Sequence, residues 1–161
     1  PTHENKITLN SPQSYMRLND FSTPKIEYLD HTADLGVRVY SQDLKTLFEC
    51  TAEAMLSEIA EPDTIEEAML MEIVVKAIGL PDLMRKWLDE INFRHEVDGF
   101  LFRRAEVREI STRSIRSLVF GEPYDRGKHT RLTEIKSVTF HQLQVEQLVD
   151  KSWVAQVVFD I

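Results

Sequence analysis

The chain has 161 residues, of which 42% are hydrophobic and 29% are charged, a balance typical of one globular domain rather than a disordered chain. Its formal net charge of −8 is opposite in sign to that of most proteins that hold nucleic acid through its phosphates. No run of about 18 apolar residues predicts a membrane span, and no basic start followed by an apolar segment predicts a secretory signal. A single cysteine, Cys50, excludes an intramolecular disulfide and a cysteine-rich zinc site, and we expect a reducing compartment.

The charge is unevenly distributed along the chain. Residues 101–136 contain nine Lys or Arg and five Asp or Glu, a net of +4, so the remaining residues carry −12. Two interpretations remain open for this basic region. It is either a patch that faces RNA or an acidic partner, or the solvated face of a hairpin.

The first 24 residues differ in composition from the remainder of the chain. Residues 1–24 are rich in Asn, Ser, Gln, Thr and Pro, and their apolar residues follow no period. We therefore predict an N-terminal extension over 1–24 and a folded domain over 25–161. Within that domain, Leu35, Val37 and Val39 recur at every second position, which predicts a half-buried opening strand.

Two amphipathic helices are predicted from apolar residues at three- and four-residue steps. The first begins after Ser41 or Asp43, either of which can accept hydrogen bonds from otherwise unpaired backbone N–H groups, and it ends before Pro62. The second begins near Pro81, whose missing N–H costs nothing in a first helical turn, and ends at Gly99. The apolar stripes consist of Leu44, Leu47, Phe48, Thr51, Ala52, Met55 and Ile59 in the first helix and of Leu80, Leu83, Met84, Trp87, Leu88 and Ile91 in the second.

The other predicted elements are strands. One strand separates the helices and four β-rich segments follow them, over residues 68–78, 100–110, 115–121, 135–149 and 151–161. The order is therefore β-α-β-α-β-β-β-β. This order predicts an α+β two-layer sandwich, in which the two helices pack on one face of a mainly antiparallel sheet.

A group of polar residues immediately precedes the opening strand. Asp30, His31, Thr32 and Asp34 all carry side chains that can ligate a metal ion or bind a ligand. The end of a strand suits a site, because the sheet fixes the backbone while the approach stays open. The alternative is a turn in which the Asp and Thr side chains bond to their own backbone.

The C-terminal strand is a second candidate site. It ends abruptly on Asp160 and Ile161, and if Ile161 is the native end, its free carboxylate lies one residue from the Asp160 carboxylate. Two negative groups this close need a cationic partner, or one of them must take up a proton. That partner is either a metal ion or a Lys or Arg side chain.

Residues 135–141 are a third polar segment, and they contain Lys136 and His141. In a straight strand these two side chains point to opposite faces, so they share a site only across a bulge or a bend. The sequence contains no glycine-rich phosphate loop, no G-x-S-x-G elbow and no H-E-x-x-H helix. It therefore gives no direct indication of an enzyme active site.

Four short motifs, taken together, resemble the archease family. They are His31-Thr32-Ala33-Asp34, Gly121-Glu122-Pro123-Tyr124-Asp125, Glu134-Ile135-Lys136-Ser137-Val138-Thr139-Phe140-His141 and the closing Val158-Phe159-Asp160-Ile161. No motif is long, but their order, their spacing and the Asp-Ile ending make the resemblance specific, and it covers the chain from about Lys25 to Ile161. Two features depart from the family pattern: the N-terminal extension, and Phe140 in place of a tyrosine.

The resemblance implies an accessory protein without catalytic activity, which activates the RNA ligase of tRNA splicing and RNA repair. In that family the protein promotes guanylylation of the ligase and its multiple turnover. RNA is then contacted only through the ligase, no membrane is involved, and the protein is expected in the cytoplasm, and also in the nucleus of a eukaryote. The implied calcium site maps to Asp34, Asp160 and the Ile161 carboxylate, whose hard oxygen donors suit Ca²⁺ better than zinc. The implied partner-facing residues are Lys136, His31 and His141.

Two other functions are compatible with these residues. One is a small metal-dependent hydrolase, in which Asp34 and Asp160 hold the ion and His31 or His141 acts as the base. The other is a general chaperone or scaffold, which does not need the metal site.

Overall fold

The computed structural model describes residues 6–8, 15–17, 23–30 and 34–161. Two short strands, β1 (Lys6–Thr8) and β2 (Tyr15–Arg17), pair with each other outside the main domain. The domain contains two helices, α1 (Leu44–Ile59) and α2 (Leu80–Asp98), and a 3-10 turn, η1 (Pro62–Thr64). Its strands are β3 (Lys25–Asp30), β4 (Asp34–Ser41), β5 (Met69–Lys76), β6 (Phe100–Ile110), β7 (Ser114–Pro123), β8 (Ser137–Val138), β9 (Gln144–Gln147) and β10 (Trp153–Asp160).

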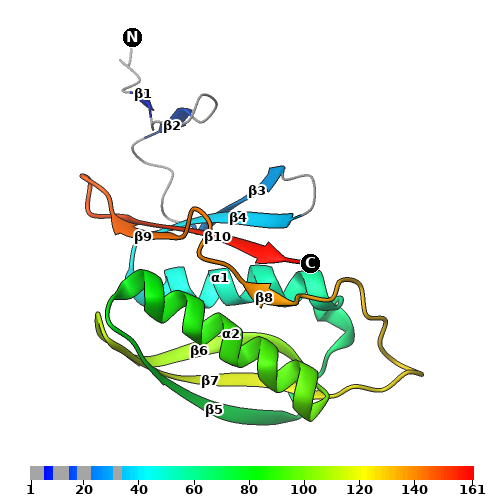
Figure 1. Ribbon diagram of the computed structural model, residues 1–161. Helices are drawn as coiled ribbons and strands as arrows, with labels where there is room; N and C mark the ends of the chain where they lie inside the picture. Colours follow the sequence, from blue (N-terminus) through cyan, green and yellow to red (C-terminus); the bar gives the residue numbers. More distant parts are fainter. Residues whose placement is uncertain (1–5, 9–14, 18–22, 31–33) are drawn as a thin grey trace.

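The helices lie between two antiparallel sheets (Figure 1). One sheet has the order β3-β4-β10-β8, with β9 also paired to β10, and the other has the order β5-β7-β6. The predicted α+β class, with two helices packed on antiparallel sheet, is confirmed. The strands differ from the predicted single sheet because they divide into two groups, one on each side of the helices.

Two strand predictions need correction. The segment 25–30 forms a strand, β3, that pairs with β4, so within the domain two strands rather than one precede α1. The predicted strand over 135–149 is divided into β8 and β9 by a turn. At this turn Leu143 donates its N–H to the carbonyl of Phe140, and Gln142 has a positive φ of 51°. A non-glycine residue in this conformation is uncommon, and β-propensity in the sequence gives no sign of it.

The helix boundaries follow from local chemistry that the sequence predicts. The Oδ1 of Asp43 accepts a hydrogen bond of 2.9 Å from the backbone N–H of Thr46, so Asp43, rather than Ser41, caps α1. Pro81 stands in the first turn of α2, and Gly99 ends that helix with a φ of 71°, a conformation that glycine adopts without strain.

The core connects α2 to the three-stranded sheet through Trp87, which is fully buried. Its indole N–H donates to the Ser117 hydroxyl at 2.8 Å, and that hydroxyl donates to the carbonyl of Ile73 at 3.0 Å. The ring of Phe48 from α1 lies 5.6 Å from the Trp87 ring, between centroids. One aromatic side chain thus links both helices with β5 and β7, and its polar N–H has a partner.

Gly121 of β7 lies directly against the backbone of β6. A Cβ at this position would overlap the carbonyl of Leu101 and the Cα of Phe102, all of them backbone atoms that cannot move aside. The strand therefore requires glycine here for space rather than for conformational freedom.

We predict that Gly121→Ala destabilises the fold by about 3 kcal/mol, because overpacking against backbone forces the strands apart. The Tm should fall by roughly 6–12 °C in a thermal melt. Gly127→Ala is the matched control, since its Cβ would meet only the Asp125 carboxylate oxygen at 3.4 Å. Equal melting temperatures for the two variants would contradict the steric argument.

Candidate functional site

The structure brings Asp34 and Asp160 to one end of the five-stranded sheet. β4 begins at Asp34 and β10 ends at Asp160, and the two residues are direct partners in the antiparallel register. Both are partly buried. Side chains directly opposite on neighbouring strands have Cβ atoms about 5 Å apart, so the two carboxylates share one small region.

Lys136 and Ser137 flank Asp160 on its other side. Ser137 of β8 is the register partner of Asp160, and the N–H of Lys136 donates to the Asp160 carbonyl at 2.8 Å. The side chain of Lys136 is exposed, and Ile161, which follows Asp160, is 40% exposed. Three segments that are far apart in sequence therefore meet at this end of the sheet.

The structure shows which partners the carboxylates of Asp34 and Asp160 have. Like charges directly opposite on neighbouring strands repel, and within the described residues neither Asp34 nor Asp160 forms an ion pair or hydrogen bond through its carboxylate. No group of three His, Cys, Asp or Glu side chains that could hold a metal is found in that part of the chain. A metal at this pair would therefore need further donors that are not such side chains, for example backbone carbonyls and water.

The two predicted histidines are placed differently. His31 lies outside the described residues. His141 is exposed on the turn between β8 and β9, where its N–H donates to the Thr139 hydroxyl at 3.2 Å. Lys136 and His141 thus stand on opposite sides of β8 in the chain.

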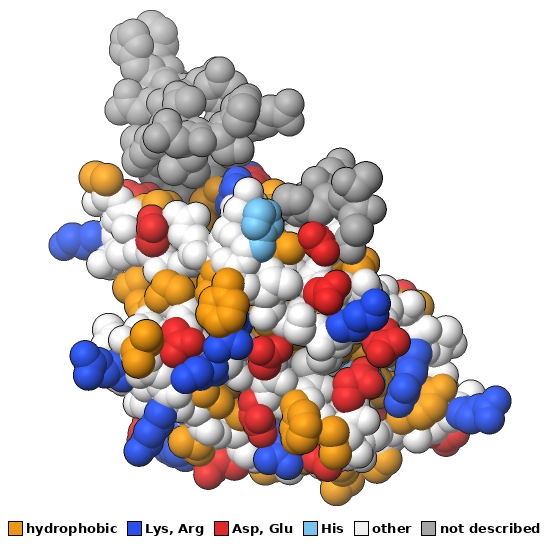
Figure 2. All heavy atoms as spheres, in the orientation of Figure 1, with side chains coloured by type: hydrophobic (Ala, Val, Ile, Leu, Met, Phe, Trp, Pro, Cys, Tyr) orange, Lys and Arg blue, Asp and Glu red, His pale blue; other side chains and the backbone are white. Residues whose placement is uncertain are grey.

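A groove of about 500 Å³ lies beside Lys136, between α2 and β8. Its α2 side carries Asp89, Glu90 and the half-exposed ring of Phe93. On the face that α2 presents, acidic, basic and hydrophobic side chains lie intermixed, with no patch of a single sign (Figure 2). Lys136, the residue before β8, therefore adds a basic group to a surface of mixed charge.

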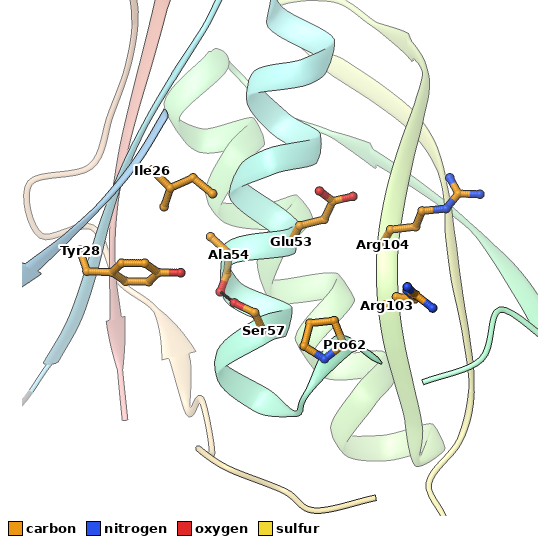
Figure 3. A pocket seen from close by; sticks show the side chains of 8 residues that line it. All are labelled: Ile26, Tyr28, Glu53, Ala54, Ser57, Pro62, Arg103 and Arg104. Carbon is orange, nitrogen blue, oxygen red and sulfur yellow. Dashed lines mark hydrogen bonds between the residues drawn. The ribbon is translucent and has the colours of Figure 1, made fainter. Parts of the chain in front are cut away.

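A second hollow of about 400 Å³ lies between β3, α1 and β6 (Figure 3). The Tyr28 ring points from β3 toward Ser57 of α1, whereas Arg103 and Arg104 point away from it on β6. Both arginines are engaged elsewhere, Arg103 with Asp63 and Arg104 with Glu67 and Glu106. This hollow is separate from the carboxylate pair and presents no unpaired arginine.

Most of the basic region over 101–136 is neutralised by nearby acidic groups. Besides the two arginines just described, Arg108 pairs with Glu106, Arg116 with Glu72 and Glu109, and Lys128 with Glu66 and Glu122. This pairing favours the solvated hairpin face over an RNA-binding patch.

The segment over 121–129 contains a buried network that the sequence did not predict. The Nδ1 of His129 accepts the Asp125 N–H at 3.0 Å, so its Nε2 donates to Glu122 at 2.6 Å. The hydrogen bond from Lys128 lowers the pKa of Glu122. The stabilisation from this carboxylate is therefore present at neutral pH and is lost as the pH falls through its lowered pKa.

Fold and site together define a small α+β protein with a pair of in-register carboxylates, flanked by a lysine, at one end of a sheet. The model of the archease protein family matches residues 26–161, and the chain belongs to that family. Proteins named archease from Methanopyrus kandleri and Pyrococcus abyssi are 38% and 33% identical over 138 residues, which is 84% of this chain and 98% and 97% of theirs. The family predicted from the short motifs is thereby confirmed.

Solved structures share the fold. The solution structure of protein 1598 from Methanobacterium thermoautotrophicum is 28% identical, has a TM-score of 0.72 and is matched over 84% of this chain and 98% of that one. The crystal structure of an archease from Thermotoga maritima, described as a possible chaperone, has a TM-score of 0.57 at 20% identity and supports the fold alone. Neither helix of the described structure has the length and apolar character needed to cross a bilayer.

We predict that Cys50 is a slow nucleophile, because burial in α1, together with Glu53 and Glu49, raises the pKa of its thiol to about 11. At pH 7.5 less than about 0.1% of the thiol is then ionised, so alkylation should be at least tenfold slower than that of an ordinary cysteine. The iodoacetamide rate, followed by mass spectrometry, should rise about tenfold per pH unit between pH 7 and 10. A rate that levels off near pH 8.5 would show an ordinary thiol.

Proposed function

We propose that this protein is an accessory activator of the RNA-splicing ligase, which promotes guanylylation of the ligase and its multiple turnover without catalysing a step itself. The observation that supports this most is the convergence of Asp34, Asp160 and the Lys136 backbone at one end of the sheet. Family membership supports the same function. Because the chain is acidic and most of its basic region is ion-paired, we propose that it contacts RNA only through the ligase.

We further propose a Ca²⁺ site at this end of the sheet. Asp34, Asp160 and the terminal carboxylate of Ile161 would supply three anionic oxygens, and backbone carbonyls and water would complete the six to eight ligands that calcium takes. An all-oxygen donor set of this kind suits a hard cation rather than zinc. When bound, the ion would supply positive charge that offsets the repulsion between the in-register carboxylates.

In this function Lys136 contacts the ligase or its bound nucleotide. Its side chain is exposed and lies outside the hydrophobic core, so it is available to an acidic group of a partner. Its backbone is tied to the proposed metal-binding strand, which would hold the Cα of Lys136 in a fixed relation to the metal. A metal-dependent hydrolase is the second function compatible with the carboxylate pair, and the experiments below distinguish the two.

Lys136→Ala should weaken stimulation of multiple-turnover ligation by the cognate ligase by about tenfold, while the Tm changes by less than about 2 °C, as for most exposed positions. Lys76→Ala, which removes the same charge from the edge of the other sheet, is the control and should activate like wild type. A large drop in the Tm of Lys136→Ala would show that the residue has a structural role and would contradict the proposed contact with a partner. RNA hydrolysis by the protein alone, lost in Asp34→Ala, would favour the hydrolase.

Appending a few residues after Ile161 should weaken Ca²⁺ binding, because it removes the terminal carboxylate and leaves every side chain in place. Asp160→Ala should weaken it further, and Ca²⁺ should raise the Tm of wild type by mass action. Calcium titration by calorimetry measures each affinity, with the same residues added before Pro1 as the control. An unchanged affinity after the C-terminal addition would exclude the terminal carboxylate as a ligand.

A further inference from the structure

The segment that carries Lys136 has almost no regular structure of its own. Residues 132–136 belong to no helix or strand, and they are preceded by an isolated bridge between Ala60 and Arg131 and followed by the two residues of β8. Hydrogen bonds to other parts of the fold must therefore fix the backbone from which the lysine projects. Two residues of α2 provide such bonds.

The peptide group between Ile135 and Lys136 is held at both ends. Its N–H, on Lys136, donates to the Asp160 carbonyl at 2.8 Å, and its carbonyl, on Ile135, accepts from the Asn92 side-chain amide at 2.7 Å. A peptide group is planar, so two bonds on opposite sides fix its orientation. The position and direction of the Lys136 side chain at its Cα are thereby tied to α2 on one side and to β10 on the other.

Asp89 holds the same segment two residues further on. Its Oδ1 accepts the N–H of Val138 at 2.9 Å, and its Oδ2 accepts a hydrogen bond of 3.2 Å from Arg85. The guanidinium of Arg85 in turn lies 4.2 Å from the centre of the Phe140 ring. Asp89 and Asn92 are three residues apart on α2, so they face the segment from one side of the helix.

The need to pair buried polar groups does not by itself explain why an asparagine occupies position 92. The residue is only 5% exposed and stands on the buried stripe of α2 beside Leu88 and Ile91. Its amide pairs the Ile135 carbonyl, but its own Oδ1 is buried and has no partner in the described part of the protein. An apolar residue of similar size would leave the Ile135 carbonyl unpaired instead, so one buried acceptor lacks a partner in either case. What asparagine contributes is therefore a hydrogen bond that orients the peptide group between Ile135 and Lys136.

We infer that Asp89 and Asn92 are positioning residues, which act through Lys136 by holding its backbone in the orientation that activation of the ligase requires. This inference rests on the proposed function. It differs from a docking role for the groove beside α2, in which Asp89 would act through its charge. Glu90 is the matched comparison, because it lines the same groove and its carboxylate bonds to Arg94 rather than to the segment of Lys136.

The free protein gives the first test, by amide hydrogen exchange in NMR spectra. Asp89→Ala and Asn92→Ala should each speed exchange at Lys136 and Val138 by about tenfold, because local opening no longer breaks a side-chain bond. Asp89→Asn keeps the acceptor for the Val138 N–H and should stay near wild type, as should Glu90→Ala. Unchanged exchange in both alanine variants would overturn the positioning role without any reference to the ligase.

Ligase turnover gives the second test, as a double-mutant cycle. Asp89→Ala should lower activation by about tenfold in the wild-type background, since small displacements of a positioned group are costly. In the Lys136→Ala background it should have no further effect, because the residue acts through the lysine. Asp89→Asn should restore activation, whereas a charge-docking role would make Asp89→Asn and Glu90→Ala as harmful as Asp89→Ala.

The possible results separate the two proposals. Faster exchange at Lys136 with full activation in Asp89→Ala and Asn92→Ala would overturn the positioning role and leave the proposed function intact. Equal losses of ligase activation from Asp89→Ala in the wild-type and Lys136→Ala backgrounds would also overturn the positioning role. If wild type does not stimulate the ligase, the proposed function fails, while the exchange experiment still decides whether Asp89 and Asn92 hold the backbone at Lys136 and Val138.

Discussion

The antiparallel pairing of β4 with β10 is the interaction on which the rest of the domain depends. These strands occupy the middle of the five-stranded sheet, with β3 beyond β4 and with β8 and β9 beyond β10. Their inward side chains Val37, Val39, Val157 and Phe159 are fully buried. The pairing also brings together residues more than 100 positions apart, as in the 2.9 Å hydrogen bond from Arg38 to Gln156. Because the register fixes which side chains oppose each other, it also sets Asp34 against Asp160.

The sequence predicts those parts of the fold that depend on local chemistry. Asp43, Pro81 and Gly99 mark helix ends because capping and backbone constraints act within a few residues. The alternation of Leu35, Val37 and Val39 likewise predicts β4. The division of the strands into two sheets is not local. It depends on which strands pair, and periodicity carries no information about partners.

The candidate site was predictable only in part, for the same reason. Composition marks Asp34 and Asp160 as polar residues at strand ends, but their opposition follows from a register that no local pattern specifies. The family resemblance brought them together in one site, because motif order stands in for the missing contact information. Asn92 was missed, although a polar residue on an apolar helical stripe is a signal that sequence inspection can find. His129 was missed because it lies in a loop whose packing only the structure reveals.

The central place of β10 also has a consequence for synthesis on the ribosome. The chain is made from its N-terminus, so β3, β4 and both helices emerge long before the strand that completes their sheet. Until that strand is made, β4 has an open edge, and Asp34 has no carboxylate opposite it. A nascent chain interrupted before residue 153 would therefore expose unpaired backbone N–H and C=O groups along this edge of β4, a state that cellular quality control can distinguish from the finished fold. Translation of β10 thus completes the sheet and sets Asp160 against Asp34 in a single event.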